Sequence, residues 1–218
     1  MFEVVDARRY WRCRECLATF LDPAQHPDLT TEKAEYDQHQ NRADDPRYRA
    51  FLQPVAEILV DRLAAGSSVL DYGCGPGPAL GQMLSARGYR VSLYDPIYRP
   101  DSSALQTRYD AVTCTEVVEH FHRPAHEFRR LDSLLRPGGW LVIMTRFQTD
   151  DARFAGWHYR RDPTHVVFYR PRTFEVLAGQ YRWQLQCTPP TLVVIRKQLK
   201  PQRARSDSPS PACACPSP

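Results

Sequence analysis

The sequence predicts an α/β protein built on a doubly wound, mostly parallel sheet of six or seven strands. From residue 68 onwards, short apolar runs alternate with helical segments, which is the pattern of parallel strands joined by crossover helices. The first run leads into a turn with glycine at three alternate positions. The last two runs, 182–187 and 191–196, are separated by a short turn, so we expect an antiparallel C-terminal hairpin strand to complete the sheet.

The length of 218 residues indicates one principal domain with additions. We expect residues 1–45 to form a half-ribbon and a polar lid segment, 46–198 the α/β domain, and 199–218 a tail. The tail is rich in proline and serine and has one large apolar residue at its start, so it is expected to be disordered. Its C-x-C pair, Cys213 and Cys215, is expected to be inert.

Charge and cysteine content narrow the functional classes. The net charge is +4, and without a basic C-terminal cluster the chain is nearly neutral, so no general nucleic-acid surface is expected. No apolar run approaches the roughly 20 residues that span a bilayer. Seven cysteines, an odd number, fit a reducing compartment, and we expect a cytoplasmic protein. The basic cluster consists of Arg196, Lys197, Lys200, Arg203 and Arg205.

A C-x-x-C motif, Cys13 to Cys16, stands near the start of the chain. It is half of a zinc knuckle, and a structural zinc site needs four ligands. The nearest other donors are His26 and His39, and no second C-x-x-C precedes the first. The alternative is a turn that persists without metal, and we predict no metal site.

A polar segment, 30–45, precedes an amphipathic helix that begins after Pro46. Pro54 is expected to kink or restart this helix, and Gly66 to end it. The polar segment is expected to lie over the ligand cleft at the strand ends.

The first strand, 68–71, ends in Asp71, and the glycine turn follows directly. A dinucleotide turn would offer backbone N–H groups to a pyrophosphate, but Pro76 and Pro78 each remove such a donor. Asp71 disfavours a dianionic ligand and favours a cationic one, such as the sulfonium of S-adenosylmethionine. The alternative is an ordinary strand-to-helix turn, with its helix running to about residue 87.

The D-x-G-x-G-x-G pattern resembles motif I of the class I S-adenosylmethionine-dependent methyltransferases. Residues 109–120, Y-D-A-V-T-C-T-E-V-V-E-H, and 134–145, L-L-R-P-G-G-W-L-V-I-M-T, resemble the later motifs of that superfamily, and the resemblance covers roughly 48–197. The run from Tyr36 to His165 is similar to bacterial small-molecule enzymes of the methyltransferase-domain type, related in pattern to the quinone-biosynthesis methylases. Such relatives often carry an N-terminal zinc ribbon, of which this chain keeps only the second half.

The resemblance implies a Rossmann-like fold, S-adenosylmethionine as cofactor and a small-molecule methyl acceptor. It leaves the acceptor and the methylated atom open, and nothing in the sequence indicates the oligomeric state. Three alternatives remain: an RNA methyltransferase that binds phosphates through its half-ribbon and basic C-terminus, a non-catalytic S-adenosylmethionine-binding module, and a nicotinamide enzyme.

The second strand, 90–94, ends at Asp95, 24 residues after Asp71. An acid at that spacing is expected to accept hydrogen bonds from ribose hydroxyls, the alternative being a cap or turn residue. Only fourteen residues separate Asp95 from Asp110, so the third strand is expected to be lost or shrunken, and Asp101 is the nearest candidate for an adenine contact. The expected cofactor-binding set is Asp71, Tyr72, Gly73, Gly75, Gly77, Asp95, Pro96 and Glu116.

The later elements are a strand at 111–115, a helix at 124–135, a strand at 140–145 and a helix at 172–179. The loop 150–166 leaves the sheet edge where parallel sheets bind ligands, so we expect it to form a wall of the acceptor pocket. Within it, His165 or His158 is the expected base and Asp162 the residue that orients it. The alternative is a purely structural loop.

Glu119 and His120 form another candidate pair beside the cofactor sulfur, the alternative for Glu119 being an exposed charge at a helix start. The histidines of the loop could hold a metal ion, but the sequence offers no convincing third ligand.

Overall fold

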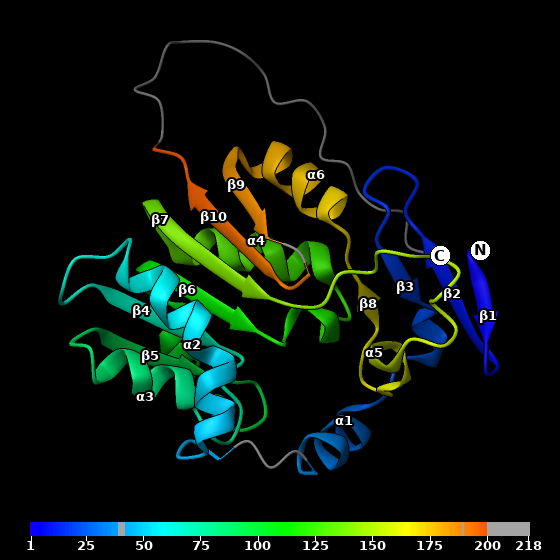
Figure 1. Cartoon of the computed structure of the whole chain (residues 1–218), viewed down its shortest axis with the longest axis horizontal. Coiled ribbons are helices and arrows are strands. Elements are labelled where there is room, and N and C mark those ends of the chain that lie inside the picture. The colour runs from blue at the N-terminus through cyan, green and yellow to red at the C-terminus, as the bar shows by residue number, and fades with distance from the viewer. Residues whose placement is uncertain (39–41, 189, 200–218) are drawn as a thin grey trace.

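The computed structural model describes residues 1–38, 42–188 and 190–199. Its main sheet has six strands in the order β5-β4-β6-β7-β10-β9 (Figure 1). The four strands β5, β4, β6 and β7 are parallel, and β10 and β9 run antiparallel at one edge. The bounds are β4 (Ser68–Tyr72), β5 (Arg90–Tyr94), β6 (Tyr109–Thr115), β7 (Leu135–Met144), β9 (Trp183–Thr188) and β10 (Leu192–Lys197).

Helices cover both faces of this sheet because successive strand residues point to opposite sides. Val69 and Val142 pack with α2 (Pro46–Val60) and α3 (Ala79–Ser85) on one face. Leu70 and Leu141 pack on the other face, together with residues of α4 (Pro124–Leu134) and α6 (Pro171–Tyr181). Each strand is therefore apolar on both sides, as expected for a parallel sheet between two helical layers.

The predicted doubly wound, Rossmann-like fold is confirmed, including the antiparallel C-terminal hairpin. The segment between β5 and β6 contains only the short 3-10 helix η2 (Ser102–Leu105), so no third strand lies in this described segment. The physical reason is length, because a crossover helix and a strand need more residues than this segment has.

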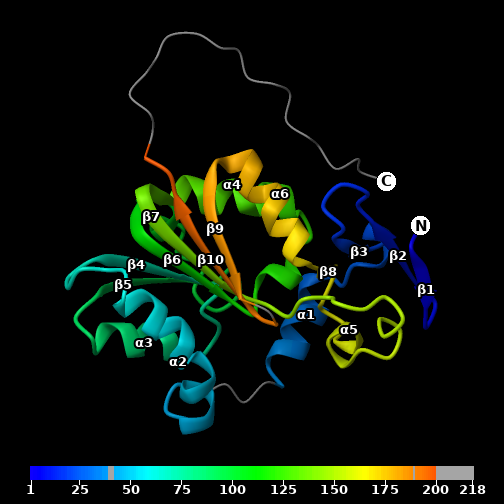
Figure 2. The same ribbon diagram turned by 45° about the horizontal axis from the view of Figure 1, so that its top comes forward.

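The N-terminal residues form a second sheet that the sequence did not predict. It comprises β1 (Glu3–Val5), β2 (Arg8–Arg12), β3 (Thr19–Leu21) and β8 (Val167–Phe168), all antiparallel in that order. Figures 1 and 2 show it beside α5 (His158–Arg161), away from α2 and α3. The first residues of the chain thus pair with the strand that follows the 150–166 loop.

Helix α2 continues through Pro54 without the interruption that was expected. Pro54 and Ala50 both lie on the exposed side of the helix, where water can satisfy the Ala50 carbonyl that the proline ring leaves unpaired. The helix ends earlier than predicted, at Val60, and Gly66 takes a positive φ of 76° in the turn before β4.

Between β3 and α2 lie the short 3-10 helix η1 (Pro23–Gln25) and helix α1 (Leu29–Tyr36), and most of α1 falls in the predicted polar segment. Asp28 caps α1 by accepting a hydrogen bond from the Thr31 amide at 2.8 Å. None of the helices in the described part of the chain is long and apolar enough to cross a bilayer.

The C-x-x-C motif lies in a tight turn in which the Leu17 amide donates to the Cys13 carbonyl. Within the described ranges, no group of three potential metal ligands includes Cys13 or Cys16. His39, Cys213, Cys215 and the predicted tail from residue 200 lie outside the described residues.

Candidate functional site

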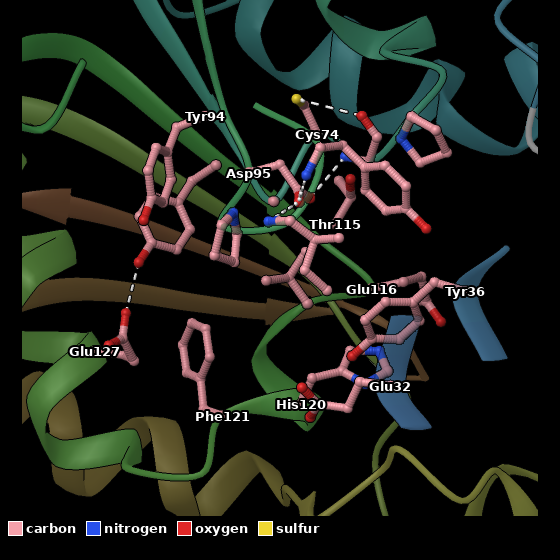
Figure 3. Close-up of a pocket in the computed structure, with 18 of the residues that line it drawn as sticks. Glu32, Tyr36, Cys74, Tyr94, Asp95, Thr115, Glu116, His120, Phe121 and Glu127 are labelled. Atoms are coloured by element: carbon pink, nitrogen blue, oxygen red, sulfur yellow. Dashed lines mark hydrogen bonds between the residues drawn. The ribbon is translucent and has the colours of Figure 1, made fainter. Parts of the chain in front are cut away.

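A cavity of about 780 Å³ lies at the C-terminal ends of β4, β5 and β6, beneath α1 (Figure 3). We call it the central cavity. Parallel sheets bind ligands at this edge because the strand-to-helix loops gather there. One end is lined by the glycine turn and Asp95, and the other by His120, Asp162 and His165.

The glycine turn is close-packed against the segment that follows β6. Gly73 has a φ of 77°, and a Cβ there would lie 2.4 Å from Cγ2 of Val117. The amides of Gly73 and Cys74 both donate to the Tyr94 carbonyl, which ties the turn to the end of β5. Gly73, Gly75 and Gly77 all line the central cavity, as predicted for a cofactor turn.

Asp95 lies at the cavity wall and organises the surrounding loops. Its Oδ2 accepts the Gly75 amide at 3.0 Å, and its Oδ1 accepts the amides of Ile97 and Tyr98 at 2.8 and 2.9 Å. Since each carboxylate oxygen has two lone pairs, Oδ2 retains one acceptor position. Asp95 is therefore a turn-forming residue that can still accept a hydrogen bond from a ligand hydroxyl.

Asp71 points beneath the turn and is not among the residues that line the cavity. Its carboxylate accepts the Thr113 hydroxyl at 3.0 Å, and burial raises the pKa of Asp71 to about 6. Asp71 is therefore not placed for the expected direct contact with a sulfonium in the cavity. Asp71 instead supports the turn from below, because its side chain follows the pleat into the layer between β4 and α3.

Tyr72 and Pro96 do line the cavity, as expected. The Tyr72 hydroxyl donates to Oε2 of Glu127 at 2.5 Å, and its ring packs near Tyr94 with a centroid distance of 5.2 Å. Two aromatic rings at this position offer an apolar surface to a flat ligand group.

Glu116 is the first residue after β6 and faces the central cavity. It has a φ of 52°, uncommon for a residue with a side chain, and its amide donates to the Met144 carbonyl at 2.8 Å. Burial raises the pKa of Glu116, and nearby Arg146 opposes that rise. Such strain at a ligand-facing strand end is typical of functional residues.

Glu119 is completely buried, contrary to the alternative of an exposed charge at a helix start. It lies in the 3-10 helix η3 (Val118–His120), and its Oε1 accepts the Tyr159 hydroxyl at 2.6 Å. Its Oε2 accepts the Thr145 hydroxyl at 3.0 Å. Burial raises the pKa of Glu119, and the negative charge of Glu116 adds to this rise.

The loop 150–166 brings His165 against His120, with ring centroids 4.7 Å apart. The loop is held there because the Val166 amide donates to the Glu119 carbonyl at 2.9 Å. Nε2 of His165 lies 3.7 Å from Oδ2 of Asp162, and both residues line the cavity. The expected pairing of Asp162 with His165 is therefore present in the geometry.

Asp162 also shapes its own loop by accepting the amide and hydroxyl of Thr164. Burial favours its neutral form, but the His165 imidazole and the Thr164 hydrogen bonds outweigh burial, so the pKa of Asp162 lies below its ordinary value.

His158, the other expected base, is exposed at the start of α5 and does not line the cavity. The structure corrects that expectation, because the helical turn of α5 directs Tyr159, not His158, into the interior. Nothing in the local sequence distinguishes the two. The sequence did hold a signal for buried Glu119, which directly follows two valines after a buried strand.

Helix α1 covers the acceptor end of the cavity (Figure 3). The Tyr36 ring meets His120 edge-on at 5.2 Å, and burial raises the pKa of Tyr36. Glu32 contacts Nε2 of His122 at 2.8 Å. The expectation that this segment lies over the cleft agrees with these contacts.

Residues 36–188 match the family model of the methyltransferase domain. The chain belongs to this family. Membership of this family confirms the prediction of a class I S-adenosylmethionine-dependent methyltransferase. It also confirms S-adenosylmethionine as the cofactor. The nicotinamide alternative is set aside on the same ground.

Curated relatives of the methyltransferase domain include ubiquinone biosynthesis O-methyltransferases. The protein from Chromobacterium violaceum is 33% identical over 120 residues, which are 43% of this chain and 51% of the relative. That from Xanthomonas axonopodis pv. citri is 35% identical over 127 residues, 46% and 53% of the two chains. This chain thus spans about half the length of the curated relatives it matches.

Solved structures share the fold at low sequence identity. The 1,6-didemethyltoxoflavin-N1-methyltransferase of Burkholderia thailandensis superposes with a TM-score of 0.56 at 16% identity, covering 88% of this chain and 99% of the other. A SAM-dependent methyltransferase from Archaeoglobus fulgidus gives 0.54 at 15% identity, covering 78% and 100%. These matches support the Rossmann-like fold.

Proposed function

We propose that this protein transfers the methyl group of S-adenosylmethionine to a hydroxyl group of a small molecule. The observation that carries the proposal is the continuity of one cavity from the glycine turn to the His120–His165 cluster. Its volume of about 780 Å³ lies in the range of small-molecule and cofactor sites. A hydroxyl acceptor is favoured because the curated relatives at 33% and 35% identity are O-methyltransferases.

The residues of the cofactor end would hold S-adenosylmethionine by shape and by hydrogen bonds. Glycines without Cβ atoms allow close backbone approach, and Oδ2 of Asp95 keeps an acceptor position for a ribose hydroxyl. The carboxylate of Glu116 faces the cavity, and a negative charge there suits a positively charged sulfur. When bound, the cofactor supplies an electrophilic methyl group.

At the acceptor end, we propose that His165 takes the proton that the hydroxyl loses when no metal ion is bound there. Its Nδ1 lies 2.7 Å from the Tyr159 carbonyl oxygen, which can only accept, so the neutral ring keeps its lone pair on Nε2. Asp162, 3.7 Å from that nitrogen, would stabilise the resulting imidazolium. Tyr36 and the rest of α1 would exclude water from the reacting groups.

Calorimetry with S-adenosylhomocysteine tests the cofactor end. Asp95→Ala should weaken binding at least about tenfold, because it removes a ribose acceptor and loosens the turn. Asp101→Ala is the matched control, since Asp101 is exposed, caps η2 and is absent from the cavity lining. Equal affinity in wild type and Asp95→Ala would overturn the ribose assignment.

A labelled-methyl transfer screen with hydroxylated small molecules tests the acceptor class. RNA remains the second candidate because of the basic C-terminal cluster. Two residues of this basic cluster lie in the described part of the chain. Arg196 lies over the Trp140 ring, and Lys197 donates a hydrogen bond to the Asp132 carboxylate. A salt-dependent affinity for RNA, with no transfer to small molecules, would favour RNA instead.

A further inference from the structure

Three potential metal-ligating side chains converge behind the acceptor end of the central cavity. The ligand atoms of Glu119, His120 and His165 all lie within 4.8 Å of one another. Ligands that share one zinc-like ion at about 2.1 Å can be separated by at most about 4.2 Å. Small side-chain rotations therefore suffice to bring all three onto a common cation.

Both histidines are held in the tautomer that a metal requires. Nδ1 of His120 lies 3.1 Å from the Thr164 carbonyl oxygen, and Nδ1 of His165 lies 2.7 Å from that of Tyr159. A carbonyl oxygen only accepts, so each Nδ1 carries the hydrogen and each neutral ring has its lone pair on Nε2. A backbone carbonyl behind each ring is the usual support of a metal-ligating histidine.

Glu119 is oriented in the same way, by hydroxyl groups behind its carboxylate. Tyr159 and Thr145 each donate to one of its oxygens, at 2.6 and 3.0 Å. Each oxygen keeps one further lone pair, so the carboxylate can still bind a cation. Metal-ligating carboxylates are commonly fixed by such hydrogen bonds.

The negative charge of the buried carboxylates also favours a bound cation. Glu119 is fully buried, and no ion pair with lysine or arginine reaches it among the residues that the structure describes. A second carboxylate, Glu116, shares the Tyr159 hydroxyl at 3.4 Å. Arg146 compensates Glu116 in part. A bound cation would compensate Glu119 as well, and burying one carboxylate beside another is costly without such a charge.

We propose that Glu119, His120 and His165 bind one divalent transition-metal cation. Two imidazoles and one carboxylate suit zinc, iron or manganese better than calcium. His120 and His165 line the central cavity whereas Glu119 lies behind them, so the open coordination positions face the acceptor. The sequence offered no third ligand for a metal site made by the loop histidines; the fold instead joins His165 of that loop to Glu119 and His120.

This inference deepens the proposed function and depends on it for the role of the ion. A cation at this point orients an acceptor hydroxyl and lowers its pKa, which favours a phenol or an enol as substrate. The hydroxyl proton then passes to Asp162, the oxygen–methyl bond forms, and the electron pair of the broken sulfur–methyl bond stays on sulfur. When the ion is bound, the lone pairs of both imidazoles are used on it, so Asp162 replaces His165 as the proton acceptor.

The test is zinc binding by the full chain after dialysis against a chelator, measured by competition with a chromophoric indicator. Wild type should bind one zinc ion per chain. Glu119→Gln and His120→Gln should each weaken that binding at least about a hundredfold. His120→Gln is included because His120 is only half-buried, so this variant is expected to fold even if Glu119→Gln does not.

Two controls exclude other sites. His158→Ala removes an exposed histidine of the same loop and should leave zinc affinity unchanged. Cys13→Ser/Cys16→Ser removes the C-x-x-C motif and should also leave it unchanged. Zinc binding that is absent in wild type, or that survives in folded His120→Gln but not in the cysteine variant, overturns the proposal.

The metal test needs neither cofactor nor acceptor, so its outcome is separate from that of the proposed function. Zinc binding without S-adenosylhomocysteine binding would leave the site standing and remove the methyltransferase role. Binding of S-adenosylhomocysteine with no zinc binding would overturn the metal site and leave the proposed function standing.

Discussion

The Thr19 hydroxyl donates to Oε1 of Gln148 at 2.7 Å, a buried hydrogen bond between residues 129 positions apart. It joins β3 of the N-terminal sheet to the segment that leaves β7 toward the acceptor loop. Nε2 of the same glutamine donates to Oδ1 of Asp151 at 3.1 Å. The half-ribbon therefore braces the acceptor loop, whether or not its cysteines bind metal.

Asp151 completes this brace by pairing with Arg12 of β2 and with Arg170. We predict that Asp151→Asn raises the KM for the acceptor severalfold and speeds proteolysis of the 150–166 loop, while S-adenosylhomocysteine affinity stays unchanged. The expected loss of stability is at most about 1 kcal/mol, because Asp151 is half-exposed. Asp150→Asn, which removes only an exposed pair with Arg153, is the control. Equal loop proteolysis in both variants would contradict the brace.

Gly73→Ala should weaken S-adenosylhomocysteine binding and destabilise the protein by about 2 kcal/mol or more. The new Cβ would meet Val117 at 2.4 Å and would also sit at a φ of 77°. Gly75→Ala separates the two causes, since its φ is 62° but no atom lies within 4 Å of its Cβ. Gly75→Ala should therefore destabilise less, and urea unfolding measures both.

A second substitution tests the clash directly. Val117→Ala added to Gly73→Ala should recover part of the lost stability, because it removes the two Cγ atoms that the new Cβ would meet at 2.4 and 2.7 Å. No recovery in the double variant would mean that backbone strain alone accounts for the effect.

Asp71 predicts a pH dependence of stability. Its pKa is about 6 in the folded protein against 3.8 for an ordinary aspartate, because burial penalises the charged form. The folded state thus binds more protons between these values, and the free energy of unfolding falls as pH rises from about 4 to about 6. At about 1.4 kcal/mol per pKa unit, the contribution is roughly 3 kcal/mol.

Asp71→Asn should remove the fall in the free energy of unfolding between pH 4 and pH 6. The free energies measured by urea unfolding at pH 4 and pH 7 should therefore differ less in the variant than in wild type. Asp110→Asn provides a contrast, because the contribution of Asp110 to the free energy of unfolding rises with pH whereas that of Asp71 falls. Burial of Asp110 favours its neutral form, but hydrogen bonds from Ser68 and Arg136 outweigh burial and lower the pKa of Asp110. An unaltered pH dependence in Asp71→Asn would show that the buried carboxyl does not titrate in this range.

Local patterns in the sequence were sufficient for the main sheet. The strand predicted at 90–94 has the same bounds as β5, and the helix predicted at 124–135 differs from α4 by one residue. These two predictions are accurate because apolar periodicity and turn residues act within a few positions of each other. Strand β8 is only two residues long and depends on pairing with β3, so no local pattern indicated it.

The cavity-lining positions of the glycine turn, Tyr72 and Asp95 were likewise predictable, since these residues lie at the ends of two adjacent strands. The direction of Asp71 was not, because it depends on which side of β4 faces α3. Nor could the sequence separate His158 from His165, because the turn of α5 exposes His158, whereas the contact of the following loop with η3 buries His165.

The sequence by itself determined the order of strands and helices, the glycine turn and the family. Only the tertiary structure decided that Glu119, His120 and His165 meet, because the backbone contact between Val166 and Glu119 joins two segments distant in the chain. Such a meeting depends on how the loop packs against η3, and no periodicity within either segment encodes it.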